Sequence, residues 1–359
     1  MRVTVLGGGH GCYAAAADLS EQGHEVSLWR RDAAALQAVV RSGCISLKDY
    51  KGQRDVPIFR ATADIGKAVR DAELIVIATP AFSQTDIAIA IAPHLSDGQV
   101  LLLPPGTFGS YVMAKEAGRA GCKAAVAFAE TGTLPYLARK HGDAEVAITT
   151  RAKRLPTGVF PASATTAAMA VIASVYPAVE RVEDALSAAL MNAGPIIHPP
   201  LILMNAGPLE HFESWDIHNE GTQPAIRRVT DALDAERVAL REALGYAAPH
   251  FPLADHYNSD RWMYGNAHDK LVDSGDWHEH IDLKTHRYMR EDVAYGLAFL
   301  VSVADWAGLE APVASGLLAV AGAVCGETFA NGPRTIGALG LSRLDLAAMK
   351  LLLDSGVAQ

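Results

Sequence analysis

The chain has 359 residues, half of them hydrophobic and a fifth charged, which is ordinary for a soluble globular protein of about two domains. Its 31 basic and 40 acidic residues give a net charge of −9. This balance argues against a nucleic-acid partner, because phosphate binding needs a basic surface.

The first half of the chain, to about residue 180, alternates short β-branched runs with amphipathic stretches. Apolar runs at 74–78 and 100–103 are typical of parallel strands that are buried on both faces. This alternation predicts an α/β fold, a Rossmann-type doubly wound parallel sheet. The expected elements in chain order are a strand over 2–6, a helix over 10–22, a strand over 25–29, a helix over 32–42, and strands over 74–78, 100–103, 124–128 and 146–149.

The second half of the chain has a different character. Helical periodicity dominates and β-rich runs become rare. The sequence therefore predicts a dinucleotide-binding domain over 1–180 and a mainly α-helical substrate and catalytic domain over 181–359. The expected helices cover 182–190, 223–244, 290–307 and 313–324.

A glycine turn, Gly7-Gly8-Gly9-His10-Gly11, joins the first strand to the first helix. In the G-x-G-x-x-G fingerprint the first glycine allows a tight turn, the second lets the backbone approach a pyrophosphate, and the third lets helix and strand pack closely. Cys12 stands where the third glycine or alanine is expected. The turn predicts an NAD or NADP site lined by Gly7, Gly9, His10, Gly11 and Cys12.

The end of the second strand bears on the choice of cofactor. An NAD enzyme usually places Asp or Glu there to accept hydrogen bonds from the ribose 2′-hydroxyl, whereas this chain has Arg30 and then Arg31. Guanidinium groups pair with a 2′-phosphate through forked, charge-assisted hydrogen bonds, so we favour NADP over NAD. The alternatives are that both arginines are solvated, or that Asp32 turns back to hold a ribose hydroxyl.

Two later loops follow predicted strands. Ligands of open α/β sheets lie outside the carboxyl ends of the strands, where these loops would be. They are either cofactor contacts or ordinary strand-to-helix turns. The residues expected to contact the cofactor are Thr79, Pro80, Pro105 and Gly106.

The four cysteines are scattered, with no metal-ligand spacing, so we expect reduced thiols and no metal site. The start of the chain lacks the apolar segment of a secretory signal. The longest apolar stretches, such as 317–325, fall short of the roughly 18 residues needed to cross a bilayer. We therefore expect a cytoplasmic protein with no membrane partner.

Two segments of the helical half are candidates for acid/base chemistry. In the run 192–200, His198 is locked between apolar residues and a Pro-Pro pair, as either a satisfied core residue or a catalyst. In the run 285–293, charges gather at the start of a helix. They are either carboxylates favoured by the helix dipole or part of a site.

Together with the glycine turn, these segments resemble the octopine/nopaline (opine) dehydrogenase family, including the bacterial N-(1-carboxyethyl)norvaline dehydrogenase type. The resemblance runs over most of the chain and implies an N-terminal Rossmann domain and a C-terminal helical domain. Its further motifs are Pro105-Gly106, Glu130-Thr131, the run from Asn192 to Pro199, Asp234-Ala235-Glu236-Arg237, Arg287-Tyr288 and Glu291-Asp292.

The resemblance also implies roles for individual residues. His198 would be the general acid/base, with Asp292 as the carboxylate that fixes its tautomer. Arg287 would bind the carboxylate of a 2-oxo acid, a bidentate task suited to guanidinium. Asn192 would contact the substrate and Thr131 the cofactor.

The implied reaction is the NAD(P)H-dependent reductive condensation of an amino acid with a 2-oxo acid such as pyruvate. The apolar helices over 300–324 favour a homodimer. The segment 255–280 is either a surface excursion or the lining of the amine pocket. The alternatives are a carbonyl reductase similar to ketopantoate reductase or glycerol-3-phosphate dehydrogenase, and a non-catalytic dinucleotide sensor. Such reductases rely on a lysine, and Lys270, Lys284 and Lys350 lack that setting.

Overall fold

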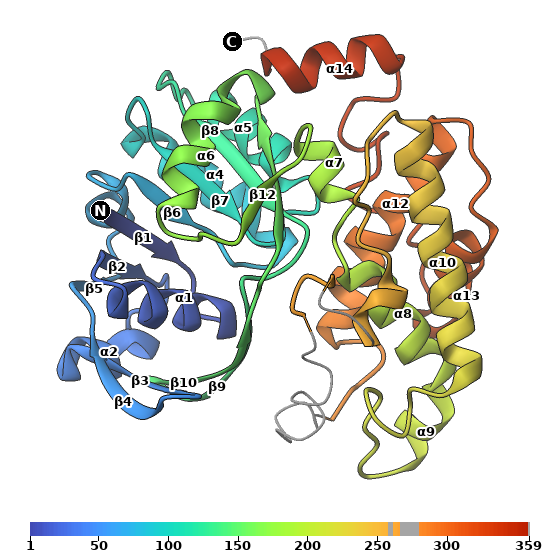
Figure 1. Ribbon diagram of the computed structural model, residues 1–359, viewed down its shortest axis with the longest axis horizontal. Coiled ribbons are helices and arrows are strands. Elements are labelled where there is room, and N and C mark those ends of the chain that lie inside the picture. Colours follow the sequence, from blue (N-terminus) through green and yellow to red (C-terminus); the bar gives the residue numbers. More distant parts are fainter. Residues whose placement is uncertain (258–260, 266–279, 358–359) are drawn as a thin grey trace. The chain divides into compact units, whose positions relative to one another are not determined.

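The computed structural model describes residues 1–257, 261–265 and 280–357 (Figure 1). The chain divides into two compact units, one of residues 1–189 with 352–359 and one of residues 190–351. The sequence placed the boundary at residue 180. The first unit instead continues to Ala189, and the C-terminal segment from Leu352 belongs to it.

An eight-stranded sheet forms the centre of the first unit, in the order β12-β11-β8-β7-β6-β1-β2-β5. Neighbouring strands are parallel except for β8 and β11, so the structure confirms the predicted Rossmann-type parallel sheet and adds one antiparallel pair. The strands are β1 (Arg2–Leu6), β2 (Glu25–Trp29), β5 (Arg60–Thr62), β6 (Leu74–Val76), β7 (Val100–Leu103), β8 (Ala127–Thr131), β11 (Leu155–Phe160) and β12 (Val179–Arg181).

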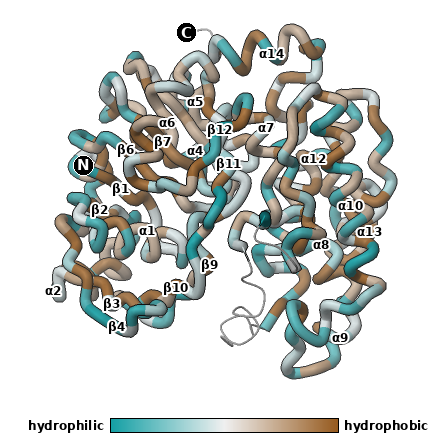
Figure 2. Tube along the Cα trace, in the orientation of Figure 1, coloured by the Kyte–Doolittle hydropathy of each residue, from teal (hydrophilic) through white to brown (hydrophobic). Residues whose placement is uncertain are grey.

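The central strands β6 and β7 are buried at every residue, and Figure 2 shows them in the hydrophobic colour. The chain passes from β1 through β2 on one side to β6 on the other side of β1. Dinucleotides bind at such a reversal of strand order, outside the carboxyl ends of the strands. The fold therefore puts the glycine turn after β1 at the edge where a cofactor is expected.

Helices α1 to α7 belong to the first unit. The helix predicted over 32–42 is shorter than expected, because the Asp32 carboxylate accepts the backbone N–H groups of Ala34 and Ala35 and starts a 3₁₀ turn (Ala34–Leu36). Further 3₁₀ turns are Ala81–Ser83, Ala92–His94 and Ala162–Ala164. The helices are α1 (His10–Glu21), α2 (Gln37–Ser42), α3 (Ile65–Val69), α4 (Gln84–Ile91), α5 (Gly109–Arg119), α6 (Thr165–Ala173) and α7 (Ala185–Ala189).

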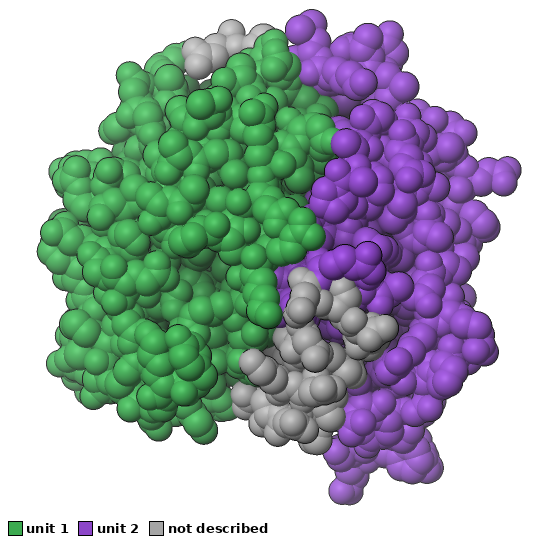
Figure 3. All heavy atoms as spheres, viewed as in Figure 1, with its two compact units in different colours: residues 1–189, 352–359 green, residues 190–351 purple. Residues whose placement is uncertain are grey.

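The second unit, drawn in purple in Figure 3, is helical in its described parts, as the sequence predicts. The helix expected over 290–307 is a π-helix (Tyr288–Leu297) continued by α12. The other elements are α8 (Gly194–Met204), α9 (Ala206–His211), α10 (Pro224–Ala243), the 3₁₀ turn Leu253–Tyr257, α12 (Ala298–Trp306), α13 (Pro312–Cys325) and α14 (Leu346–Ser355), whose last turn belongs to the first unit.

One described stretch, Ala185–Met204, is long and apolar enough to cross a membrane by length and composition alone. Of its most apolar window, 83% is buried inside the protein. Core helices of soluble proteins pass the same test, so this stretch is weak grounds for a membrane span.

The first unit also contains a four-stranded sheet, in the order β4-β3-β10-β9, that the sequence did not predict. The strand expected over 146–149 belongs to this sheet and not to the large one, which corrects the prediction. Its inward side chains, such as Ile45, Leu47 and Val146, join the core that surrounds α1. The strands are β3 (Cys44–Asp49), β4 (Gly52–Pro57), β9 (Tyr136–Gly142) and β10 (Glu145–Arg151).

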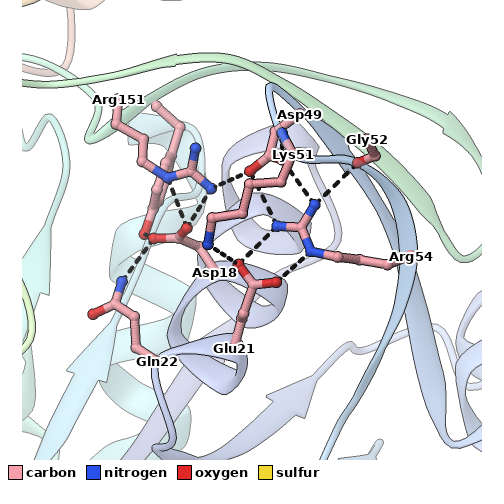
Figure 4. Close-up of polar contacts among 9 residues, drawn as sticks. Asp18, Glu21, Gln22, Asp49, Lys51, Gly52, Arg54 and Arg151 are labelled. Atoms are coloured by element: carbon pink, nitrogen blue, oxygen red, sulfur yellow. Dashed lines mark hydrogen bonds and ion pairs between the residues drawn. The ribbon is translucent and has the colours of Figure 1, made fainter.

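A network of charged groups holds this small sheet on α1 (Figure 4). The Asp49 side chain has no exposed surface and accepts hydrogen bonds from Arg54 at 2.8 Å and Arg151 at 2.7 Å. Arg54 also pairs with Glu21 of α1, and Arg151 pairs with Asp18 of α1 at 2.6 Å. Since each buried charge has oppositely charged neighbours, the network ties β3, β4 and β10 to one helix.

Candidate functional site

The glycine turn forms a cradle at the start of α1. Gly7 has φ +128°, a conformation that favours glycine. A Cβ at Gly7 would lie 2.7 Å from both Cys12 Sγ and Thr79 Cγ2, whereas a Cβ at Gly9 would meet nothing within 4 Å. Gly9 makes no side-chain cap and the first turn of α1 has no acidic residue. An open side facing backbone N–H groups at a helix N-terminus suits a pyrophosphate.

Cys12 supports this turn from within. Its thiol is fully buried and donates to the carbonyls of Leu6 at 3.5 Å and Ala78 at 3.2 Å. Burial raises its pKa to about 11, so the thiol is neutral and unreactive at physiological pH. Gly11 also packs near Ala78, since a Cβ at Gly11 would lie 3.4 Å from the Ala78 Cβ. Cys12 thus performs the packing task of the expected small residue.

Arg30 lies directly over the turn. A Cβ at Gly8 would be 2.6 Å from Arg30 Nε and 2.9 Å from its Cζ, and Nη1 donates to the carbonyl of Ala35 at 3.2 Å. Arg31 behaves differently, because its side chain is 70% exposed and lies 3.8 Å from Asp86. Asp32 caps the following turn, as described above. The structure therefore places Arg30, and neither Arg31 nor Asp32, at the glycine turn.

The loop after β6 brings an unsatisfied polar atom to the same place. Thr79 Oγ1 is buried and makes no hydrogen bond with any described residue, while Thr79 Cγ2 is the atom that packs on Gly7. A buried hydroxyl without a protein partner beside a glycine cradle fits an added polar group there. Pro80 follows and caps the 3₁₀ turn Ala81–Ser83.

The loop after β7 is held by a buried carboxylate. Glu130 of β8 has no exposed surface and accepts the backbone N–H groups of Phe108 and Ser110, each at 2.9 Å. A Cβ at Gly106 would collide with this carboxylate, and Pro105 follows a cis peptide bond. Glu130 therefore fixes the shape of the loop that carries Pro105 and Gly106, a role that the sequence did not indicate.

Two other expected cofactor contacts are engaged with protein groups. The Thr131 hydroxyl is fully buried and donates to the carbonyl of Thr133. His10 Nδ1 accepts the backbone N–H of Lys140 at 2.8 Å, which ties the start of α1 to β9.

In the second unit, the structure brings together the two residues expected to form an acid/base pair. His198 Nδ1 of α8 lies 2.8 Å from Asp292 Oδ2 of the π-helix, and their side chains are 14% and 13% exposed. With Nδ1 donating to the carboxylate, Nε2 is the nitrogen left for a substrate proton. Burial lowers the pKa of His198 and Asp292 opposes this shift, so the imidazole is neutral near neutral pH.

Two glycines allow α8 and the π-helix to approach so closely. A Cβ at Gly194 would collide with the Asp292 carboxylate, and a Cβ at Gly296 would collide with the ring of Pro195. Asn192, expected to bind substrate, is buried and accepts the N–H of Gly194 through Oδ1 at 3.1 Å. Asn192 thus organises the start of α8 next to the Asp292 carboxylate.

The π-helix itself explains the five-residue spacing between Arg287 and Asp292. In an α-helix, residues five apart point about 140° away from each other, since each residue turns the helix by about 100°. In a π-helix the i→i+5 hydrogen bond brings residues five apart toward one face, and such segments often occur at functional sites. Arg287, the N-cap of the π-helix, is exposed, as a carboxylate-binding guanidinium must be.

Tyr288 and two further histidines surround the pair, and the sequence analysis assigned no role to any of the three. The buried Tyr288 ring stacks on His198 with ring centroids 3.7 Å apart and 15° between the planes. Arg287 Cζ lies 5.0 Å from the same ring. His218 is 6.1 Å from the His198 ring and His286 is 4.4 Å from the Tyr288 ring. The sequence signal for Tyr288 was its place in the motif Arg287-Tyr288.

The motif 234–237 has a structural role. Arg237 is buried, pairs with Asp234 at 2.7 Å and donates to the carbonyls of His250 and Phe251. Glu236 accepts the first backbone N–H groups of α13, at 2.7 and 2.9 Å. These residues fix a loop and a helix start around α10.

Part of the segment 255–280 lies outside the described residues, including His268, Trp277, His278 and Lys270. Its described residues Trp262 and His256 contact each other, with ring centroids 5.4 Å apart. Within the described ranges, no group of three or more His, Cys, Asp or Glu residues is arranged to hold a metal ion.

Two family models match the chain. NAD/NADP octopine/nopaline dehydrogenase, alpha-helical domain, matches residues 181–325, and Ketopantoate reductase PanE/ApbA matches residues 3–146. An opine dehydrogenase from Arthrobacter sp. (strain 1C) is 28% identical over 353 residues, covering 96% of this chain and 97% of that protein. Vitopine synthase from Allorhizobium ampelinum is 26% identical over 77% of each chain.

Solved structures show the same fold. Octopine dehydrogenase with NADH and L-arginine aligns with a TM-score of 0.72 and 18% identity, over 100% of this chain and 99% of that one. Yersinopine dehydrogenase with NADP+ bound aligns with a TM-score of 0.67 and 16% identity, over 99% and 98%. These two solved structures of similar fold contain different nicotinamide cofactors, NADH in one and NADP+ in the other.

Proposed function

We propose that the chain is an opine dehydrogenase, because its helical part matches the octopine/nopaline dehydrogenase model and an opine dehydrogenase aligns with it over nearly its whole length. It is an NAD(P)-dependent oxidoreductase that joins an amino acid and a 2-oxo acid such as pyruvate into a secondary amine. The observation that carries the proposal is the 2.8 Å pair of His198 and Asp292, which lies in the segment matched by the family's helical domain.

The first unit would hold the cofactor. Gly9 and the start of α1 offer the open backbone that a pyrophosphate needs, and Thr79 Oγ1 offers a buried hydroxyl without a partner among the described residues. Bound there, reduced nicotinamide would supply the hydride that converts the protonated imine to a secondary amine. The loop held by Glu130 forms a third wall at the carboxyl ends of the strands.

His198 moves the protons of the condensation. Its neutral Nε2 accepts a proton from the amino acid's ammonium group, which frees the amine to add to the carbonyl carbon. His198 then returns the proton to the hydroxyl of the carbinolamine, so that water leaves and a protonated imine (iminium) remains. Asp292 holds Nδ1 during both transfers and stabilises the imidazolium that forms between them.

Arg287 would bind the carboxylate of the 2-oxo acid. Its guanidinium is exposed beside the Tyr288 ring, and the turn of the π-helix relates it to Asp292. A planar fork of donors matches a carboxylate in two parallel hydrogen bonds and so orients the carbonyl. Asn192 contributes through its buried position at the start of α8.

NADP is the proposed preferred cofactor, with NAD as the alternative. Arg30 lies over the glycine turn, where a 2′-phosphate would need a cation. The Asp32 carboxylate instead faces the following 3₁₀ turn, where Oδ1 accepts two backbone N–H groups. Yersinopine dehydrogenase with NADP+ provides a structural precedent within the fold.

Carbonyl reduction is the second candidate, because the ketopantoate reductase model matches residues 3–146. That match covers only the cofactor-binding part. In the described helical part, Lys284 and Lys350 are exposed and neither lies in the His198 cluster, whereas the His–Asp pair is assembled. The helical unit therefore favours condensation over the lysine-dependent reduction of a ketone, and a purely sensory protein would not need the pair.

We further propose that the enzyme is a cytoplasmic homodimer with no membrane or nucleic-acid partner. Three exposed apolar side chains support a self-association surface: Val320 on α13 is 51% exposed, and Leu346 and Leu351 on α14 are 47% and 66% exposed. Light scattering coupled to size-exclusion chromatography tests the proposed homodimer, since a monomer at all concentrations would contradict it.

The decisive experiment is an NADPH-oxidation screen of amino acids against pyruvate, 2-oxoglutarate and glyoxylate. We expect rapid oxidation only when an amino acid and a 2-oxo acid are both present, with a secondary-amine dicarboxylate detected by mass spectrometry. Equal rates with the 2-oxo acid alone would show carbonyl reduction. Binding of NADPH without turnover for any pair would indicate a sensor.

A further inference from the structure

Lys140 belongs to the small four-stranded sheet and not to the large parallel sheet. It lies near the end of β9, an edge strand of the small sheet, on the same side of the strand as Tyr136 and Ala138. Both of these residues are buried in the core around α1, and the Tyr136 hydroxyl donates to Asp18 of that helix at 3.0 Å. The Lys140 side chain therefore projects from β9 toward α1.

Two contacts fix Lys140 at the first turn of this helix. Its backbone N–H donates to His10 Nδ1 at 2.8 Å. Its ammonium group lies 4.2 Å from the ring centroid of Tyr13, which is fully buried. A cation over an aromatic face is held electrostatically as well as by packing. The ring thus acts as a rigid support for the ammonium group next to the glycine turn.

Arg30 approaches the same place from the end of β2. Its guanidinium lies over Gly8 and interacts electrostatically with both Tyr13 and Lys140. Burial lowers the pKa of Lys140, and the Arg30 charge lowers it further, while Asp143 partly opposes the shift. In the described part of the chain, neither Lys140 nor Arg30 forms an ion pair. Two neighbouring cations without a paired carboxylate create a local field that favours an anion.

We propose that Lys140 and Arg30 together bind the 2′-phosphate of NADP, so that a residue of the small sheet contributes to cofactor choice. The inference rests on the proposed preference for NADP. The position after β2 is where ribose hydroxyl groups are recognised, while the pyrophosphate belongs at the start of α1. A phosphate monoester carries nearly two negative charges, which one cation alone does not balance. Arg30 supplies a fork of donors and Lys140 a point charge.

The test uses calorimetric titration of the whole protein with 2′,5′-ADP and with ADP, two ligands that differ only in the 2′-phosphate and lack nicotinamide. Lys140→Met should raise the Kd for 2′,5′-ADP about ten- to hundredfold, as expected for one charge-assisted contact, and leave the Kd for ADP unchanged. Lys140→Arg should retain most of the affinity. Lys48→Met, which removes an exposed lysine from β3 of the same sheet, should alter neither Kd.

The outcomes separate this inference from its premise. If the wild-type protein binds ADP as tightly as 2′,5′-ADP, the NADP preference is wrong and the inference falls with it. If the wild type prefers 2′,5′-ADP and Lys140→Met keeps the full preference, the preference stands and Lys140 has no part in it. Equal weakening of both ligands would also overturn the inference, because it would show damage to the fold. None of these readouts depends on opine formation.

Discussion

The imidazole of His198 stacks on the phenol ring of Tyr288, with ring centroids 3.7 Å apart and 15° between the planes. Asp292 holds the edge of the imidazole through Nδ1, and Tyr288 holds its face. Hydrogen bond and stacking together leave the ring one orientation, in which Nε2 points away from the carboxylate. Preorganised acid/base groups need this kind of restraint, because small errors in proton position are costly for the rate.

Replacing Tyr288 tests the stacking contact. Tyr288→Leu should lower kcat about tenfold, the rate equivalent of one aromatic pair, because the imidazole gains freedom about the Asp292 hydrogen bond. Tyr288→Phe retains the ring and should stay within about twofold of the wild type. The pH profile of kcat/KM should shift only in the leucine variant. Equal losses in both variants would contradict a positioning role and point to the hydroxyl group.

The acid/base pair itself predicts a larger effect. His198→Ala and Asp292→Asn should each reduce turnover about 10²–10⁴-fold, the usual contribution of a positioned acid or base. Because both residues belong to the second unit, the Kd for NADPH should change little. Stopped-flow turnover and fluorescence titration give the two quantities. Losses below about tenfold in both variants would rule out the pair as the catalytic acid/base.

The same pair predicts a pH dependence. Oxidation of the opine needs neutral His198 to accept a proton, so kcat/KM in that direction should rise with pH and level off. The midpoint should lie below the ordinary histidine value of 6.5, because burial lowers the pKa of His198. Asp292 opposes this shift, so Asp292→Asn should move the midpoint to still lower pH. A midpoint above 6.5 in the wild type would contradict this account.

Arg30 predicts a change of cofactor preference. Arg30→Asp places a carboxylate near the glycine turn, where it repels a 2′-phosphate and can accept from a 2′-hydroxyl. The ratio of the Kd values for NADP and NAD should rise at least about tenfold, the effect of one charge-assisted pair. Arg31→Asp is the matched control, because its side chain is 70% exposed and lies beside Asp86. An unchanged ratio in Arg30→Asp would return Arg30 to a structural role.

Much of the cofactor half of the fold could be predicted because local signals agree there. The apolar strands over 2–6 and 100–103 and the glycine turn between strand and helix are recognisable within a few residues. The four-stranded sheet has no such signal. β3 pairs with β10, about a hundred residues later, and its charged side chains Asp49, Arg54 and Arg151 have the pattern of solvated surface residues. Only the fold buries them against α1.

The helical half shows a similar limit. Resemblance indicated His198, Arg287 and Asp292 as a set, but the helical pattern over 290–307 predicts an ordinary α-helix. The π-helix lies against α8, which Gly194 and Gly296 allow to come close, and such packing is a tertiary property that leaves no local sequence pattern. The stacking role of Tyr288 was missed for the same reason, since contact with a residue 90 positions earlier leaves no local periodicity.

That close approach predicts a sensitive position. Gly194→Ala adds a methyl group where the Asp292 carboxylate lies, so either the carboxylate or α8 must move. We expect a loss of turnover of about a hundredfold, comparable to removing the carboxylate, with a smaller effect on the Kd for NADPH. Gly207→Ala in α9 is the matched control, because a Cβ there meets nothing within 4 Å. If both variants are equally active, the contact between α8 and the π-helix does not restrain Asp292.

The network around Asp49 predicts how stability depends on pH. Burial alone would raise the pKa of Asp49, but hydrogen bonds from Arg54, the Lys51 N–H and Arg151 outweigh it and hold the pKa well below the ordinary value of 3.8. The folded protein therefore binds this proton less readily than the unfolded chain does. The stabilisation is complete above pH 3.8 and is lost progressively as the pH falls below that value.

Asp49→Asn removes this contribution at every pH. At neutral pH the variant should lose about 1–3 kcal/mol of unfolding free energy, a moderate value because Arg54 and Arg151 keep their carboxylate partners on α1. Urea denaturation at decreasing pH measures the difference in unfolding free energy between wild type and variant. This difference should narrow only below pH 3.8. Asp55→Asn, at an exposed position of β4, should have the same unfolding free energy as the wild type. A difference that is constant down to the lowest pH would mean that the Asp49 charge does not stabilise the small sheet on α1.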